Sequence, residues 1–397
     1  MVCSNDDISI VGAIDTFVKI SEDVPDKLEM NHISNPLDSL IPRSLQLFSH
    51  QNEDILTRSI KFLTQFTYSL PFIFEENLEM FFEQIPRLGS SDSVKVRREI
   101  GKCVSMLVSC QPETVASLIP QLCGFMLELS GDEDETVRLN SGDFWLFLCD
   151  LDEDTGGLEW AEDVEIVQKI VQKLIENLHY SEEKLLTDRS DAEIEMVGEL
   201  SDSISRTIYG RGEDGASNSD WSLRKCCVLT LEAFSEFIDT ELLLSTFKQC
   251  LEVLFEQAGE MGDGEDSELV QECGVLSLGS VSGCFVGDGE YFEIFGEVFD
   301  KFVSMFQDNS IGVELRCTLC FTLSLFSVQM SYESLELFLD HLLNLVSENA
   351  SSKGTGKEFT IPYDVRVESA LISAIGTIAA NGLYFLLFYF KDFFLFF

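Results

Sequence analysis

The residues that could do chemistry are spread thinly along this chain of 397 residues. One C-x-x-C pair occurs, Cys317 and Cys320, with the spacing of half a zinc site or of a redox dithiol. No second pair accompanies it, and the four histidines are scattered. They are His32, His50, His179 and His341. The pattern favours core packing for both thiols over metal binding or redox chemistry.

Motifs typical of enzymes are absent from the sequence. There is no phosphate-binding G-x-x-x-x-G-K-[ST], no nucleophile motif G-x-S-x-G and no zinc-protease H-E-x-x-H. Many glycines lie in acidic stretches such as 131–135 and 262–266, which suit a phosphate poorly and are typical of solvated loops. We therefore expect a protein that is not an enzyme and that has no catalytic residues, cofactor or metal.

The charge balance restricts the partners. The chain has 70 acidic and 26 basic residues, giving a formal net charge of −44. Such a chain repels nucleic-acid phosphates and anionic membranes, so we expect basic protein segments as partners, with no nucleic acid and no membrane. The N-terminus, MVCSNDDISI, lacks the basic and apolar regions of a signal peptide. The 12 cysteines therefore read as reduced thiols, and most stand in apolar helical patterns. Examples are Cys103, Cys110, Cys149, Cys250 and Cys284.

A repeated unit supplies the elements that must position any binding residue. Each copy has a polar turn, an arginine after an apolar residue, and about fifteen residues of helical apolar periodicity. The arginines are Arg58, Arg97, Arg138, Arg224, Arg316 and Arg366, with Gln271 in that slot in a weaker copy. An amphipathic helix precedes each copy, as in NLEMFFEQIPRL (77–88) and TVASLIPQLCGFMLEL (114–129). The spacing fits paired-helix HEAT or armadillo repeats, which have periods of about 40–47 residues.

The pattern predicts an all-α HEAT-repeat solenoid of about seven stacked helix pairs. We expect a right-handed superhelical arch in which each second helix lines the concave face. The arginine that opens each second helix is expected to bond neighbouring loops and so to hold the repeats together.

One step between arginines, from Arg138 to Arg224, is about twice the usual length and contains an insertion. Residues 187–220 hold nine acids and three bases with little periodicity, which is typical of a mobile acidic loop. We expect helical repeats over 1–186 and 221–380. Ser219 or Asp220 should cap the helix that follows the loop, and Trp221 should pack in its first turn. The apolar tail 381–397 has no polar face and is not expected to belong to the fold.

The residues around the insertion resemble a known family. An acidic loop ending in D-W-x-L-R-K-C (220–226), followed by FIDTELLLSTFKQCLEVLF, is similar to the corresponding helix pair of the transportins. These are the karyopherin-β2 nuclear import receptors of the importin-β superfamily. DEDETVRLNSGDFWLFL (132–148) and VELRCTLCFTLSLF (313–326) resemble further repeats in collinear order, over roughly residues 10–380.

The resemblance implies a carrier that binds nuclear localisation signals of cargo proteins in a concave arch and releases them when Ran·GTP binds. It implies import through the nuclear pore, contacts with nuclear pore proteins, and shuttling between cytoplasm and nucleus. The positions that match the family's cargo contacts are Lys225, Glu232, Leu276, Thr318 and Phe321. The acids of the regulatory loop are Asp188, Asp191, Glu193, Glu195, Glu199, Asp202, Glu213 and Asp214.

Some positions depart from the family pattern. Glu232 keeps the family's acid, and Phe321 keeps an aromatic face in place of tryptophan, but Thr318 is a polar replacement for isoleucine. A further family acid falls at Ala380 and is lost. Read from the residues alone, Glu232 could be an ordinary solvated helix acid and Phe321 a core residue.

Both ends of the chain also differ from the family. The chain starts inside a repeat, so the helices with which the family grips Ran·GTP have no counterpart, and Ran binding is expected to be weakened or lost. It also stops early, which indicates a truncated or misread gene end. A membrane anchor at 381–397 is a less favoured alternative, because Lys391 and Asp392 interrupt the apolar run. The competing interpretation of the whole chain is a HEAT scaffold subunit for protein assemblies.

Overall fold

The computed structural model is built of helices, with no strand among the residues that it describes. The described residues are 6–23, 28, 35–151, 158–178, 222–261, 265–285, 301–302, 304–306, 308, 311–326, 367 and 370–377. The predicted acidic loop 187–220 and the tail 381–397 lie outside these ranges. The chain divides into unit 1, Met1–Lys173, and unit 2, Leu174–Phe397, and the division falls within one helix.

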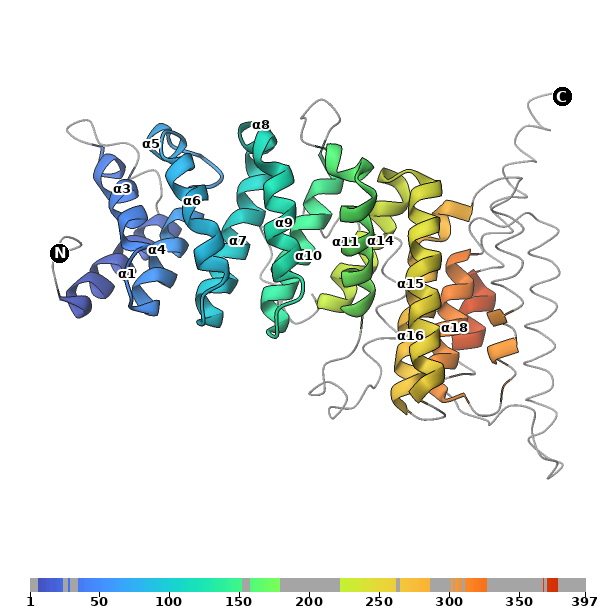
Figure 1. The fold of residues 1–397 in the computed structure, drawn as a ribbon. Helices are drawn as coiled ribbons and strands as arrows, with labels where there is room; N and C mark the ends of the chain where they lie inside the picture. The colour runs from blue at the N-terminus through green and yellow to red at the C-terminus, as the bar shows by residue number, and fades with distance from the viewer. Residues whose placement is uncertain are drawn as a thin grey trace, which may run out of the picture. The chain divides into compact units, whose positions relative to one another are not determined.

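Unit 1 consists of successive helix pairs, which follow one another in chain order in Figure 1. One layer contains α1 (Asp7–Asp23), α4 (Glu53–Thr64), α7 (Val94–Cys110) and α10 (Glu135–Cys149). The other contains α3 (Leu37–Leu47), α6 (Leu78–Gly89) and α9 (Ile119–Leu129), each packed against the helix of the first layer that follows it. Short helices α5 (Phe72–Glu75), α8 (Pro112–Val115), η1 (Ala116–Leu118) and η3 (Glu159–Glu162) lie between them.

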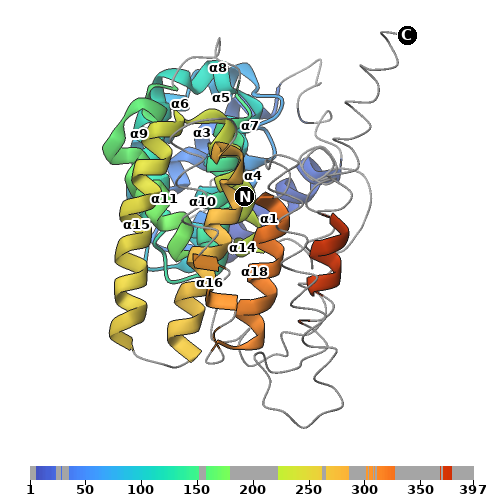
Figure 2. The same ribbon diagram turned by 90° about the vertical axis from the view of Figure 1, so that its right-hand side faces the viewer.

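Unit 2 repeats this arrangement. α14 (Leu223–Phe237), α16 (Glu265–Ser280) and α18 (Val313–Phe326) are the arginine-slot helices, and α15 (Thr240–Met261) packs on α16. Figure 2 shows α15, α16 and α18 side by side. The turn η6 (Ser282–Phe285) follows α16, and α11 (Val164–Glu176) contains the division between the units.

Within the described ranges, the predicted amphipathic helices occur where the apolar spacing placed them, and α6 illustrates the pattern; the predicted helices 291–306 and 334–346 lie wholly or mostly outside those ranges. Its buried residues are Leu78, Phe81, Ile85 and Leu88, which share one helical face. Predicted helix 114–129 differs, because it is broken into α8, η1 and α9. Pro120, in the first turn of α9, has no backbone N–H and its ring would clash with the carbonyl of Ala116 in a continuous helix.

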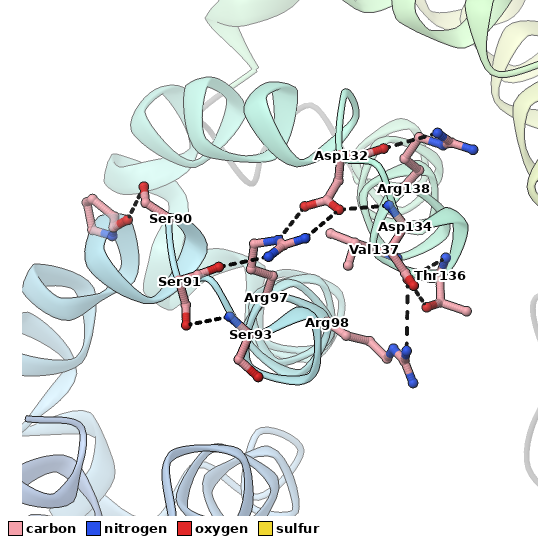
Figure 3. A network of polar contacts seen from close by, with 11 residues as sticks. Ser90, Ser91, Ser93, Arg97, Arg98, Asp132, Asp134, Thr136, Val137 and Arg138 are labelled. Atoms are coloured by element: carbon pink, nitrogen blue, oxygen red, sulfur yellow. Dashed lines mark hydrogen bonds and ion pairs between the residues drawn. The ribbon is translucent and has the colours of Figure 1, made fainter. Parts of the chain in front are cut away.

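The predicted bond from a repeat arginine to a neighbouring loop is confirmed for Arg97, whereas Arg138 and Arg316 bond the turn before their own helix. Arg97, at the start of α7, forms two hydrogen bonds to the Asp132 carboxylate, at 2.6 and 2.9 Å, and donates to the Ser91 carbonyl at 2.8 Å (Figure 3). Arg138, at the start of α10, donates to the Asp132 carbonyl at 3.0 Å. The turn before α10 is therefore held by one arginine from its own pair and by one from the preceding pair.

Other copies repeat this bonding with different acceptors. Arg58 contacts Asp15 on the neighbouring helix α1 at 2.5 Å, and Arg316 donates to the Asp308 carbonyl at 2.6 Å. Arg366 is not among the described residues. Each arginine contacts a turn or a neighbouring helix, so the repeats are joined by polar bonds as well as by apolar packing.

Among the described residues, no helix combines the length and the apolar composition that crossing a membrane requires.

We expect Arg97→Ala to lower the free energy of unfolding by about 2 kcal/mol, because hydrogen bonds to charged groups are worth about 1.5–3 kcal/mol. The Arg97 and Asp132 side chains are only 16% and 8% exposed, so solvent screens the pair little. Arg98→Ala is the matched control: Arg98 is 42% exposed and lies 3.9 Å from Asp134, so its loss should cost about 0.5 kcal/mol or less. Urea unfolding of the variants measures both.

The same pair predicts a pH dependence. Burial raises the pKa of Asp132, but hydrogen bonds from Arg97 and the Asp134 amide more than offset this and leave the pKa below its ordinary value of 3.8. A depressed pKa stabilises the folded state above the ordinary value, and this stabilisation is lost as the pH falls through the folded value. The difference between the wild type and Arg97→Ala should therefore shrink in strong acid. A difference that stays constant with pH would contradict the role assigned to the pair.

Candidate functional site

The residues predicted to contact a ligand lie on three helices of unit 2. Lys225 and Glu232 are on α14, Leu276 is on α16, and Thr318 and Phe321 are on α18. α16 packs against both α14 and α18, so the three helices form one layer. The predicted loop acids Asp188 to Asp214 lie outside the described residues, and their role stays a prediction.

α14 begins later than the sequence predicted. Its first residue is Leu223 and its N-cap is Ser222, whose side chain accepts a hydrogen bond from the Lys225 amide at 3.3 Å. The prediction that Ser219 or Asp220 caps this helix is wrong. Serine is as good a cap as aspartate, and it leaves Leu223 as the first buried residue of the helix. Trp221 lies outside the described residues.

α16 is buried along most of its length, because it has helices on both sides. Gly279 allows the close approach of α18: a Cβ at this position would lie 3.0 Å from the Thr322 side chain. Thr322 also donates a hydrogen bond to the Val275 carbonyl at 3.3 Å. Leu276 is 4% exposed, so in this packing it contributes to the core between the helices.

A buried polar network joins the three helices. Arg224 of α14 donates to the Glu272 carboxylate of α16 at 2.7 Å and to the Leu178 carbonyl at 3.2 Å. The Thr318 hydroxyl of α18 donates to the same Glu272 oxygen at 2.9 Å. Glu272 is 4% exposed and Arg224 is 8% exposed. Thr318, predicted as a ligand contact, therefore already uses its hydroxyl within the stack.

The sequence interpretation missed Glu272. It placed Gln271 in the arginine slot of this copy and assigned no role to the next residue. The available signal was a lone acid within the apolar run VQECGVLSLGSV, since an acid on an apolar helix face usually has a cationic partner. Its partner Arg224 is 48 residues earlier, a separation that local patterns do not connect.

The remaining predicted contacts are partly accessible. Lys225, Glu232 and Phe321 are half-buried, on the two helices that flank α16. Burial, and secondarily repulsion from Glu236, raises the pKa of the Glu232 carboxyl. No ion pair of Glu232 occurs among the described residues. A cation placed beside this carboxylate would lower its pKa again, and Phe321 could supply an aromatic face for apolar groups.

The thiols pack in the helix interiors. Cys320 is buried and Cys317 is half-buried, and burial, then the neighbouring Cys317, raises the pKa of Cys320 well above its ordinary value. Burial likewise raises the pKa of Cys103 to about 12. Within the described part of the chain, no three His, Cys, Asp or Glu side chains gather as a metal site would need.

Solved structures share the fold of this chain. The stacked helix pairs form a HEAT-repeat solenoid, and the neighbours are karyopherins. Importin beta matches with a TM-score of 0.64 and 11% identity, over 96% of this chain and 40% of that chain. Kap121p, in its complexes with Nup53p and with Pho4p, matches with a TM-score of 0.55 and 12% identity, over 96% of this chain and 37% of that chain. The predicted all-α HEAT-repeat fold is confirmed.

Sequence relatives narrow the class further: the homologues of this chain are transportins, also called importin subunit beta-2. The protein from Schizosaccharomyces pombe is 26% identical over 354 residues, covering 80% of this chain and 37% of the relative. Transportin-1 of Mus musculus is 24% identical over 392 residues, covering 92% and 40%. The resemblance inferred from the acidic loop and its flanks is confirmed. The chain spans about two fifths of the length of these relatives. No model of a protein family matches it.

We expect Glu272→Gln to lower the free energy of unfolding by about 2 kcal/mol, because it leaves a buried guanidinium without its carboxylate. Thr318→Val removes one neutral donor and should cost about 1 kcal/mol. The double variant should cost less than the sum, since both changes act on one network. Thermal and urea unfolding measure the three values; strict additivity would show that Thr318 and Arg224 do not share Glu272 in solution.

Proposed function

We propose that this chain belongs to a transportin-like nuclear import receptor and that α14 and α18 contact the nuclear localisation signal of a cargo protein. The observation that carries the proposal is its homology to transportins, which extends over 80–92% of the chain. This relationship favours a receptor over a generic HEAT scaffold. It also supports a non-enzymatic role, because the homologues are transport receptors.

The contacts proposed are Glu232 and Lys225, both on α14, and Phe321 on α18. Burial makes the ionised form of the Glu232 carboxyl unfavourable in the free protein. A basic group of a ligand placed beside the carboxylate would stabilise that ionised form. Import signals of this family are basic and extended, and the chain's net charge of −44 favours their approach. Leu276 and Thr318 are proposed to act indirectly, by holding α16 and α18 in place.

The wider partners are part of the same proposal. We infer contacts with nuclear pore proteins and movement between cytoplasm and nucleus, whereas the Ran binding of the family is expected to be weakened or lost in this chain. The structures of Kap121p with Nup53p and Pho4p support binding of protein segments by this fold. Coupling between cargo and Ran through the acids of 187–220 remains an expectation from the family.

We expect Glu232→Gln to move stability and binding in opposite directions. A raised folded pKa means that ionised Glu232 destabilises the fold, so stability falls as the pH rises through its titration, and glutamine should remove that loss. At neutral pH the variant should therefore unfold at a higher temperature, yet bind a basic proline-tyrosine import-signal peptide more weakly. Calorimetric unfolding and fluorescence anisotropy measure the two effects.

Glu252→Gln is the matched control, since Glu252 is an exposed acid on α15. Glu252→Gln removes one negative charge, as Glu232→Gln does, and should change neither the unfolding temperature nor the peptide affinity by much. Weaker stability together with weaker binding in Glu232→Gln would indicate a structural residue and would contradict the assignment.

We expect Phe321→Ala to weaken binding of the same peptide by about 1–3 kcal/mol, the usual range for an aromatic interface residue. Added salt should weaken binding by the wild type and by Phe321→Ala in proportion, because Phe321 carries no charge. Circular dichroism checks the fold of the variant, since Phe321 is half-buried. Loss of helicity alongside loss of affinity would place Phe321 in the core instead.

A further inference from the structure

A second surface, on unit 1, carries exposed aromatic side chains that packing does not explain. Tyr68 is 81% exposed and Phe72 is 71% exposed, on either side of Leu70 in the turn between α4 and α5. Both are large apolar groups left in water, at a cost of roughly 25 cal/mol per Å² of apolar area. We call this pair and its turn, residues 66–72, the aromatic turn.

The backbone holds the two aromatics outward. Leu70 has φ 36°, the one positive φ of a non-glycine residue in the described chain. This left-handed conformation is unfavourable for a residue that has a side chain. The conformation turns the Leu70 side chain inward, where it is 9% exposed, and leaves Tyr68 and Phe72, two positions before and after it, on the outside. Such an outlier supports a hypothesis of function, because a relaxed turn would serve a purely structural connection.

The next repeat braces the turn and adds charge beside it. The Gln111 side chain donates to the Tyr68 carbonyl at 2.6 Å, which ties the turn to the start of α8. α5 and α8 lie at the same end of the helices of unit 1 in both views (Figure 1, Figure 2). Glu75 and Glu76 follow Phe72 within one helical turn, and Glu113 lies in the first turn of α8. All three carboxylates are exposed.

Cations are absent from this part of the sequence. Neither 62–86 nor 103–137 contains a lysine or arginine. Two cations stand nearer in sequence: Lys61, in the last turn of α4, which pairs with Glu99 at 3.5 Å, and Lys102, within α7. The cluster of Lys95, Arg97 and Arg98 stands at the start of α7, whereas Gln111 follows its end. A helix of 17 residues separates the two ends by roughly 25 Å, well beyond the screening length of about 8 Å in physiological salt. The carboxylates beside the aromatic turn are therefore not neutralised by that cluster.

We propose that the aromatic turn is a docking site for an arginine-bearing, apolar segment of a protein partner. Apolar side chains of the segment cover Tyr68 and Phe72, and its guanidinium groups stack on the rings and pair with Glu75, Glu76 and Glu113. The three carboxylates favour a basic segment over an acidic one. The two aromatic rings favour a segment with apolar side chains over a basic segment that is polar throughout. The site lies in unit 1 and does not depend on the function proposed for α14 and α18.

The test measures, by fluorescence anisotropy, how tightly the full chain binds a synthetic peptide in which arginine alternates with leucine. Tyr68→Ala combined with Phe72→Ala should weaken binding at least about tenfold, as expected for aromatic anchors. This change leaves the net charge untouched, so non-specific attraction to an acidic protein is the same in both. Because both side chains are exposed, the thermal unfolding temperature should not fall.

Control variants and peptides sharpen the result. Ile8→Ala removes another exposed apolar residue, 82% exposed, and should leave binding unchanged. The comparison is repeated in the Glu232→Gln background, in which a basic peptide binds the site on α14 more weakly, and the loss caused by changing Tyr68 and Phe72 should persist there. Peptides with glutamine for arginine, or serine for leucine, should bind more weakly. Equal binding by the Tyr68/Phe72 variant, equal binding of the glutamine peptide, or disappearance of the Tyr68/Phe72 effect in the Glu232→Gln background would each overturn the proposal.

Discussion

The buried or half-buried arginine at the start of most described repeats is the constraint on which the rest of this structure depends. A helix pair cannot bury its apolar face alone, so it must stack, and a guanidinium enclosed by stacking must find acceptors in the neighbouring turns. Asp132 meets this need between α7 and α10, and Glu272 meets it between α14 and α16. The bonds fix how far one pair can slide over the next, which apolar contacts alone would leave less defined.

This constraint also decides which residues are available for binding. α16 is enclosed on both flanks, so its side chains, Leu276 included, are used for packing. The flanking helices α14 and α18 keep half-buried positions, among them Glu232 and Phe321. A carboxylate in such a position loses part of its hydration and gains no compensating partner, so its ionised form is unfavourable. A basic ligand can offset this unfavourable free energy. Under the proposed function, stability and affinity are opposed at Glu232.

The comparisons fit the same physical picture. Solved karyopherins share the fold at 11–12% identity, because stacking needs only apolar periodicity, turn residues and a polar bond at each joint. Transportins are closer in sequence, at 24–26%.

The sequence by itself determined the helices, their pairing order, the repeat arginines and the relationship to transportins, because these depend on local spacing and composition. It also pointed to Glu232 and Phe321 by resemblance. Only the tertiary structure decided that the predicted helix 114–129 breaks before α9, that Ser222 caps α14, and that Thr318 bonds Glu272 rather than facing outward. It alone joined Arg224 to Glu272 and Gln111 to Tyr68. The partners in each of these bonds are more than 40 residues apart in the sequence. The register of the stacked helices decides which acid or carbonyl an arginine or amide reaches, and no local pattern encodes that register.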